Sequence, residues 1–445
     1  MTTAPPPAVR LLDRRVFAWA AWDWGSASFN AVITTFVFTV YLTSDVFTGL
    51  TPEAPGYTAA KAALSSGLGA GLAVAGVAVA LIAPVVGRRS DAVGRRRRPL
   101  AVASAVVAAA MVGMFFVQPS PSYFWFGVAL VAIGTVAYEA GAVNYNAMLL
   151  PLSTPRSIGR ISAFGWASGY VGGIVLLVLL VTTLIPLGAF GVRLSALVCA
   201  IWFAVFAIPV LFAVPDDRRI ATGEQLGVLA TYRRLVADLV ALRRNDRNLL
   251  MFLIASAVFR DGLTGVFTFG AVIAAAVFGF TFSEVLVFGV AANLVAGVST
   301  LISGRFDDRY GPKPVIMTSL VGLVVCGTIA FALQHEGRWV FWVFGLALCL
   351  FVGPAQTSSR ALLGRLVPAE RAGELFGLYA TTGRAASFIA PAAFAALTAI
   401  AQDQGFGILG IVLVLALGLV LMLPVEGSSS PAEGAGRSLE GADHL

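Results

Sequence analysis

Apolar runs of about 20 residues recur along the whole chain, and this feature restricts its possible folds more than any other. A helix needs about 20 apolar residues to cross the hydrocarbon core of a bilayer. Hydrophobic residues make up 58% of the 445 residues and charged residues only 12%, against about 25% charged residues in ordinary soluble domains. These charges are too few to cover a soluble surface of this size, so we expect most of the chain to lie in lipid.

The apolar runs are continuous and do not alternate with a period of two, which excludes a membrane β-barrel. Helices satisfy their own backbone hydrogen bonds in lipid, so the sequence predicts an all-α membrane protein with twelve transmembrane helices. The predicted spans are 16–42, 65–86, 99–118, 123–148, 161–186, 192–214, 249–278, 283–303, 314–334, 339–358, 375–401 and 406–424.

The spans divide into two six-helix halves at 16–214 and 249–424. A charged linker at 215–248 joins them, and a polar tail at 1–15 precedes the first half. The tail at 425–445 is rich in Gly, Ser and acidic residues, a composition typical of disorder.

The basic residues predict the orientation of this bundle. We place 25 of the 30 Lys and Arg in the tails and the even-to-odd loops, and only Lys61, Arg193 and Arg338 on the opposite side. Cytoplasmic loops carry such an excess, so both termini are predicted to be cytoplasmic. The net charge of +7 then reports topology and indicates no nucleic-acid partner. Arginine outnumbers lysine 28 to 2 in a chain rich in Ala and Gly. This composition suggests a GC-rich bacterial genome, and a bacterial origin favours the plasma membrane over a vacuole.

A loop motif repeats in the two halves at a displacement of 217 residues. Its two copies contain Gly87, Asp91, Gly94 and Arg95, and Gly304, Asp308, Gly311 and Lys313. A weaker echo at a displacement of 214 relates Ala147, Leu149, Gly159 and Gly169 to Ala361, Leu363, Gly373 and Gly383. Parallel repeats of this kind are typical of secondary transporters. Glycines allow a tight reversal, the aspartates can cap or pair across the face, and the bases anchor at headgroups. The alternative is a topology anchor with no moving role.

The motif resembles the signature loop of the major facilitator superfamily, in which it helps to hold one conformation of the alternating-access cycle. A closer resemblance, to the vacuole-effluxer family of autophagy-related amino-acid effluxers and their bacterial relatives, spans nearly the whole transmembrane region. It rests on residues 19–29, 145–147, 159–170, Gln356, Ser359, Arg360, 376–379 and 383–388. The resemblance implies the major facilitator fold and a carrier for small solutes, with amino acids as the substrates of fungal members.

Five ionisable residues fall inside predicted spans: Asp23, Glu139, Arg260, Asp261 and Arg384. Each costs about 2.5–3.5 kcal/mol on insertion scales and therefore needs a partner or a function. Asp23 shares a helical face with Asn30, which suits a solute amine or a proton; the alternative is a structural ion pair with a nearby arginine.

Glu139 shares a face with Asn146, and because burial disfavours its charged form it is a candidate proton carrier. The alternative is a hydrogen bond to a neighbouring helix. Asp261 begins a polar stripe on its span, and Arg260 is expected to pair with Glu139 or Asp23. Arg384 either holds a substrate carboxylate with its two parallel donors or serves as the counter-ion of Asp23.

Gln356 is a further candidate, because the first, fourth, seventh and tenth spans line the central cavity in the superfamily that the chain resembles. Two histidines and three scattered cysteines give no metal spacing. The sequence contains neither a phosphate-binding Gly-Lys-Ser/Thr loop nor a Ser-His-Asp arrangement, so we expect neither an enzyme nor a cofactor.

These observations predict a monomeric secondary active transporter that moves a small polar organic solute by alternating access. An amino acid or related metabolite is preferred, with coupling to protons or another ion through Glu139, Asp23 or Asp261. One alternative is an exporter of hydrophobic or toxic compounds. Another is a membrane scaffold or lipid-moving protein that does not transport solutes.

Overall fold

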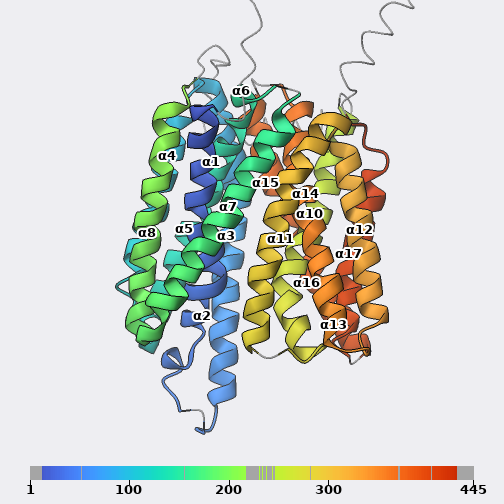
Figure 1. The fold of residues 1–445 in the computed structure, drawn as a ribbon. Coiled ribbons are helices and arrows are strands. Elements are labelled where there is room, and N and C mark those ends of the chain that lie inside the picture. Colours follow the sequence, from blue (N-terminus) through green and yellow to red (C-terminus); the bar gives the residue numbers. More distant parts are fainter. Residues whose placement is uncertain are drawn as a thin grey trace, which may run out of the picture.

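The computed structural model describes residues 13–216 and 246–427, apart from residues 52, 155, 281, 369, 370 and 402, together with residues 230, 233, 237 and 243. Every regular element in this part of the chain is helical (Figure 1). The predicted polar tail at 1–15, the linker and the disordered C-terminal tail lie largely outside the described residues.

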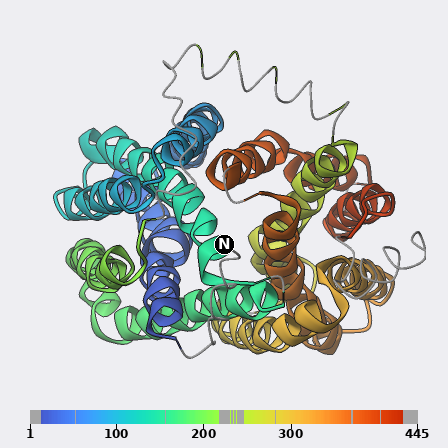
Figure 2. The same ribbon diagram turned by 90° about the horizontal axis from the view of Figure 1, so that it is seen from above.

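The helices form two groups. The first helix group contains α1 (Arg14–Ala27), the π-helix η1 (Ser28–Val37), α2 (Phe38–Leu42), η2 (Asp45–Phe47), α3 (Tyr57–Val93), α4 (Arg97–Met114), η3 (Pro121–Tyr123), α5 (Phe124–Ala147), α6 (Leu149–Leu152), α7 (Ile158–Thr183), η4 (Ile185–Leu187) and α8 (Gly188–Ala213). The second helix group contains α10 (Arg247–Ala276), α11 (Phe282–Tyr310), α12 (Pro312–Ala332), α13 (Arg338–Val340), the π-helix η6 (Phe341–Gly345), α14 (Leu346–Leu366), α15 (Ala372–Ala386), α16 (Ile389–Ala401) and α17 (Phe406–Met422). Figure 2 shows the two groups side by side.

Each group has its own hydrophobic core. One cluster of buried side chains comes from residues 16–214 with Ala361, and the other from residues 249–425 with Val85 and Ala147. The largest buried rings of the first group are stacked: the Tyr145 ring lies 4.6 Å from that of Trp19 and 4.4 Å from that of Trp22. Large apolar side chains also cover the outside, where Phe212 and Ile400 are each 78% exposed. Such an exterior suits lipid as the solvent.

Nine stretches of the described residues are long and apolar enough to cross a membrane. One 56-residue stretch contains both α7 and α8, and the 17 residues of α17 fall just below the length required. The helices α15 and α16 are shorter still, with 15 and 13 residues. The all-helical architecture is confirmed, whereas the count of twelve spans stays a prediction.

We call the end of the bundle where α1 begins and α17 ends the termini end; it is the upper end in Figure 1. The loops that carry most basic residues meet there. Lys313 Nζ donates to the Leu423 carbonyl at 3.0 Å, and the Arg97 amide donates to Asp216 Oδ1 at 3.0 Å. Which side of the membrane this end faces stays a prediction.

Two predicted boundaries were wrong in an informative way. The repeated motifs lie mostly on the last turns of α3 and α11, and each helix is followed by a glycine with positive φ, Gly94 (φ 64°) and Gly311 (φ 87°). The predicted span 375–401 is interrupted between Ala386 and Ile389. Pro391 has no N–H to donate back across this break, and the Ala390 amide instead donates to Asp261 Oδ2 at 2.6 Å.

Candidate functional site

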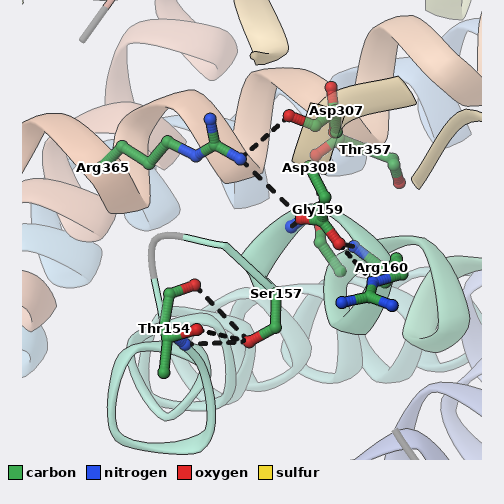
Figure 3. Close-up of polar contacts among 9 residues, drawn as sticks. Thr154, Ser157, Gly159, Arg160, Asp307, Asp308, Thr357 and Arg365 are labelled. Atoms are coloured by element: carbon green, nitrogen blue, oxygen red, sulfur yellow. Dashed lines mark hydrogen bonds and ion pairs between the residues drawn. The ribbon is translucent and has the colours of Figure 1, made fainter. Parts of the chain in front are cut away.

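The two motif aspartates cap helices of the opposite group. The first amides of a helix have no partner within the helix, and the amides in question lie at the starts of α15 and α7. Asp91 accepts hydrogen bonds from the amides of Gly373 (3.1 Å) and Glu374 (2.9 Å). Asp308 accepts from the amides of Gly159 (2.9 Å) and Arg160 (3.3 Å) (Figure 3). We call these two caps the inter-group gate.

The gate follows the internal repeat on both sides. Asp308 is the counterpart of Asp91 at the displacement of 217, and Gly373 is the counterpart of Gly159 at the displacement of 214. Each carboxylate therefore binds the helix start that corresponds to the one bound by its counterpart. The two groups are held together at the termini end by two equivalent, reciprocal contacts.

Basic side chains support each aspartate. Arg96 forms an ion pair with Asp91 at 2.8 Å, and both side chains are buried. Arg160 Nε lies 2.5 Å from Asp308 Oδ2, and Arg365 lies 3.8 Å from Asp308 Oδ1. Arg95, the base predicted for the first gating loop, donates its amide to the Ser90 carbonyl at 3.2 Å. The ionic role of the other three arginines was not predicted, because the bases of these loops were expected to anchor at lipid headgroups.

Gly87 and Gly304 serve close helix approach. A Cβ on Gly87 would overlap the Gly373 carbonyl, and a Cβ on Gly304 would meet the Ala163 Cβ at 2.7 Å. Of the four motif glycines, Gly94 and Gly311 make the tight reversal that was expected. Figure 1 shows the result for α7 and α11, which lie together at the termini end and separate toward the other end.

A buried arginine joins the groups at a second level. Arg360 of α14 donates to Ser162 Oγ at 2.9 Å and to Asn146 Oδ1 at 3.2 Å. Its Nη1 lies 3.7 Å from Asp23 Oδ2, which also accepts a hydrogen bond from the Tyr145 hydroxyl at 2.7 Å. The expected ion pair of Asp23 with an arginine is therefore present, and the arginine comes from the opposite helix group.

Arg360 escaped the site prediction because the tenth span was expected to end at residue 358. The structure continues α14 to Leu366, which places the guanidinium inside the bundle with its side chain only 5% exposed. The repeat contained a usable signal: Arg360 is the counterpart of Asn146 at the displacement of 214, and the two side chains contact each other.

Glu139 and Arg384 form a second ion pair between the groups, with α5 contributing the acid and α15 the base. Their side chains are 20% and 35% exposed. Of the two interpretations of Arg384, the one that made it the counter-ion of Asp23 was wrong, because Arg360 holds that position. Glu139 does bind a neighbouring helix, as one of its two interpretations predicted.

Arg260 and Asp261 face different partners. Arg260 donates to the Tyr379 carbonyl at 3.0 Å, and its guanidinium lies 3.8 Å from the Tyr379 ring centroid. The predicted pairing of Arg260 with Glu139 or Asp23 was therefore wrong. Asp261 is buried and binds the Ala390 amide, so it holds the start of α16 at the break in the eleventh predicted span.

The last two predicted site residues take no part in the ion pairs among the described residues. Asn30 is exposed and lies on the π-helix η1, where the α-helical spacing from which a shared face with Asp23 was expected does not hold. Gln356 Oε1 accepts a hydrogen bond from the Tyr170 hydroxyl at 3.3 Å, which is another contact between the groups. The described residues contain no cluster of three His, Cys, Asp or Glu that could hold a metal ion.

Comparison with known proteins identifies a family whose sequence pattern this chain matches. The model of the family described as "Vacuole effluxer Atg22 like" matches residues 153–434. The chain is 23% identical over 430 residues to the uncharacterized MFS-type transporter YxiO of Bacillus subtilis, covering 94% of this chain and 96% of YxiO. It is 26% identical over 309 residues to Autophagy-related protein 22 of Cryptococcus neoformans, covering 64% of this chain and 55% of that protein. The chain thus spans about half the length of the fungal relative.

The fold is similar to that of solved major facilitator transporters. The structure of the proton:xylose symporter XylE superposes with a TM-score of 0.71 at 14% sequence identity, covering 94% of this chain and 96% of XylE. At this identity the likeness shows the fold and carries no information about the substrate.

Proposed function

This chain belongs to the vacuole effluxer Atg22-like family of major facilitator transporters, and from that premise we propose that it moves a small polar organic solute by alternating access. Its relatives and fold are those of multi-pass membrane transporters. The observation that carries the proposal is that two ion pairs, Asp23–Arg360 and Glu139–Arg384, join the two helix groups inside the bundle. A rocking motion of the groups must exchange these contacts for others.

The charges favour a solute with both a basic and an acidic group. Separating a partly buried ion pair without replacement partners is unfavourable, because both charges lose their partner where water only partly replaces it. A zwitterion such as an amino acid offers a carboxylate to Arg384 and an ammonium group to Glu139, so it supplies partners while the pair separates. A purely apolar solute would leave both charges uncompensated, which argues against an exporter of hydrophobic compounds.

We further propose that the termini end is cytoplasmic and that the structure represents the outward-facing state. The inter-group gate seals the end where the basic loops meet, and cytoplasmic loops carry the excess of basic residues. Alternating access then requires the caps on α15 and α7 to break whenever the solute is exchanged with the cytoplasm. We place the protein in the plasma membrane, as a monomer.

Glu139 is the acid best placed to couple transport to protons. It is partly exposed, and its base lies on the opposite group. Protonation would remove its charge and release Arg384 to bind a solute carboxylate, and loss of that proton would then allow Glu139 to bind the solute ammonium group. Asp261 binds a backbone amide at a helix break, and Asp23 is held by both Tyr145 and Arg360, so these two acids are less free to exchange a proton.

Uptake of a radiolabelled panel of amino acids and related metabolites into proteoliposomes tests the proposal. We expect an imposed pH gradient to drive accumulation of at least one solute. Glu139→Gln should abolish the response to the gradient while solute exchange at equal pH persists. Failure of every solute in the panel to move, with protein that unfolds cooperatively on heating, would support a non-transporting scaffold instead.

A further inference from the structure

Asp307 lies within the second copy of the repeated motif, one residue before the capping Asp308. Its counterpart in the first copy, at the displacement of 217, is Ser90. The Ser90 hydroxyl is satisfied within its own helix, where it donates to the Val86 carbonyl at 2.9 Å. The second copy therefore carries an additional acid, which lies beside the capping Asp308 of the inter-group gate (Figure 3).

Asp307 is fully buried, with no exposed surface. Neither of its carboxylate oxygens accepts a well-formed hydrogen bond from any residue that the structure describes. Its side chain is pressed against α7, since a Cβ on Gly159 would overlap the Asp307 Cβ. An ionised carboxylate in such a place is unfavourable, and proton binding removes that penalty.

None of the charged groups around Asp307 that the structure describes donates a hydrogen bond to its carboxylate, although Arg365 Nε is buried without a hydrogen-bond partner. On α14, Arg365 donates to the Asp307 backbone carbonyl at 3.0 Å and lies 3.8 Å from Asp308 Oδ1. On α7, Arg160 binds Asp308. Asp308 is the acid next to Asp307 on α11. The other base of α14, Arg360, is held by Ser162 and Asn146. The hydroxyl of Ser358 faces Asp307 from α14.

We propose that Asp307 is a proton-binding site of the inter-group gate, which takes up one proton when the termini end closes and releases it when that end opens. In the open gate, water replaces α7 around the side chain and the carboxylate ionises. The proton enters from and returns to the solution at the termini end. It is therefore not transported, and this site differs from the coupling acid Glu139.

The sign of the effect follows from this cycle. The closed gate binds one more proton than the open gate, so acidic solution at the termini end favours the closed state and alkaline solution favours the open state. One linked proton changes the open-to-closed ratio by up to about tenfold per pH unit. The site would slow solute exchange at that end when the adjoining solution becomes acidic. This inference rests on the alternating access proposed above.

The test measures the gate directly, in full-length protein reconstituted in lipid nanodiscs. Spin labels replace Arg156 and Arg247, two exposed residues at the termini end of the two groups, after Cys326→Ser removes the partly exposed cysteine. The fraction of the closed distance is measured from mildly acidic to mildly alkaline pH. We expect this fraction to fall as the pH rises.

Two neutral variants decide whether Asp307 is responsible. Asp307→Asn keeps the shape of the protonated acid, and Asp307→Ser restores the residue of the first copy. Both should keep the gate closed at alkaline pH and flatten its pH dependence, whereas Glu426→Gln, at an exposed acid of the same end, should behave like the parent. A melting curve of each variant confirms folding.

Three results would overturn the inference. If the gate opens and closes with solute but does not respond to pH, alternating access is supported and the proton-binding role of Asp307 is contradicted. A pH dependence that survives in both Asp307 variants would assign the proton to another group. A gate that stays closed with every solute and at every pH would contradict alternating access itself, and this inference with it.

Discussion

Asp91→Ala removes the acceptor of two backbone amides at the start of α15 and leaves the rest of the gate in place. Loss of an N-terminal cap costs about 0.5–2 kcal/mol. The ion pair of Asp91 with Arg96 lies within the first helix group, so its loss affects the open and closed states alike. The free-energy difference between the open and closed gate should therefore change by about 1–2 kcal/mol in favour of the open gate. This is roughly a 5–30-fold rise in the open-to-closed ratio.

The assay is the rate at which a hydrophilic maleimide labels Ala372→Cys, a position that is fully buried in the closed gate. Asp216→Ala is the matched control, because Asp216 Oδ1 accepts from the Arg96 and Arg97 amides at 2.9 and 3.0 Å. It caps α4 from within the same group, so its loss should lower stability without opening the gate. Equal labelling rates in the Asp91 and Asp216 variants would show that the Asp91 cap does not hold the gate closed.

Three further changes test other contacts. Gly87→Ala should raise the same labelling rate, because its Cβ would overlap the Gly373 carbonyl, whereas Gly76→Ala, with open space around its Cβ, should not. Arg360→Met should lower the free energy of unfolding by about 3–5 kcal/mol, because it leaves the partly buried Asp23 without its counter-ion. Melting in detergent measures this loss, and an unchanged melting temperature would contradict it. Asp261→Ala should cost about 0.5–2 kcal/mol in the same assay through lost capping of α16, and a larger loss would indicate a role beyond the cap.

The residues of the gating loops could be predicted from the sequence because the motif is local and occurs twice. The positions of Asp91 and Asp308 predicted capping or pairing across one face, and the structure shows both. The amides that they bind were not predictable from the motif, because Asp91 and Gly373 lie 282 residues apart. Only the fold brings the starts of α15 and α7 to these carboxylates.

The ion pairs inside the bundle were predicted less well. Apolar length shows where a span lies but not where its helix ends, so Arg360 was assigned to a loop. A pairing between charges depends on how helices rotate against each other, which hydropathy does not record. This is why Arg260 was given the wrong partners, and why one of the two interpretations of Arg384 was wrong. The break at Ala386 has the same apolar content as a continuous helix, and only Pro391 gave a local hint.

The proposed coupling of solute movement to protons through Glu139 is measured most directly by the internal pH of proteoliposomes. A trapped pH-sensitive dye reports proton movement when a transported solute is added outside without a prior pH gradient. We expect an immediate change of internal pH in the parent protein, and solute exchange without proton movement in Glu139→Gln. Solute movement without any proton movement in the parent, or equal proton movement in the variant, would contradict it.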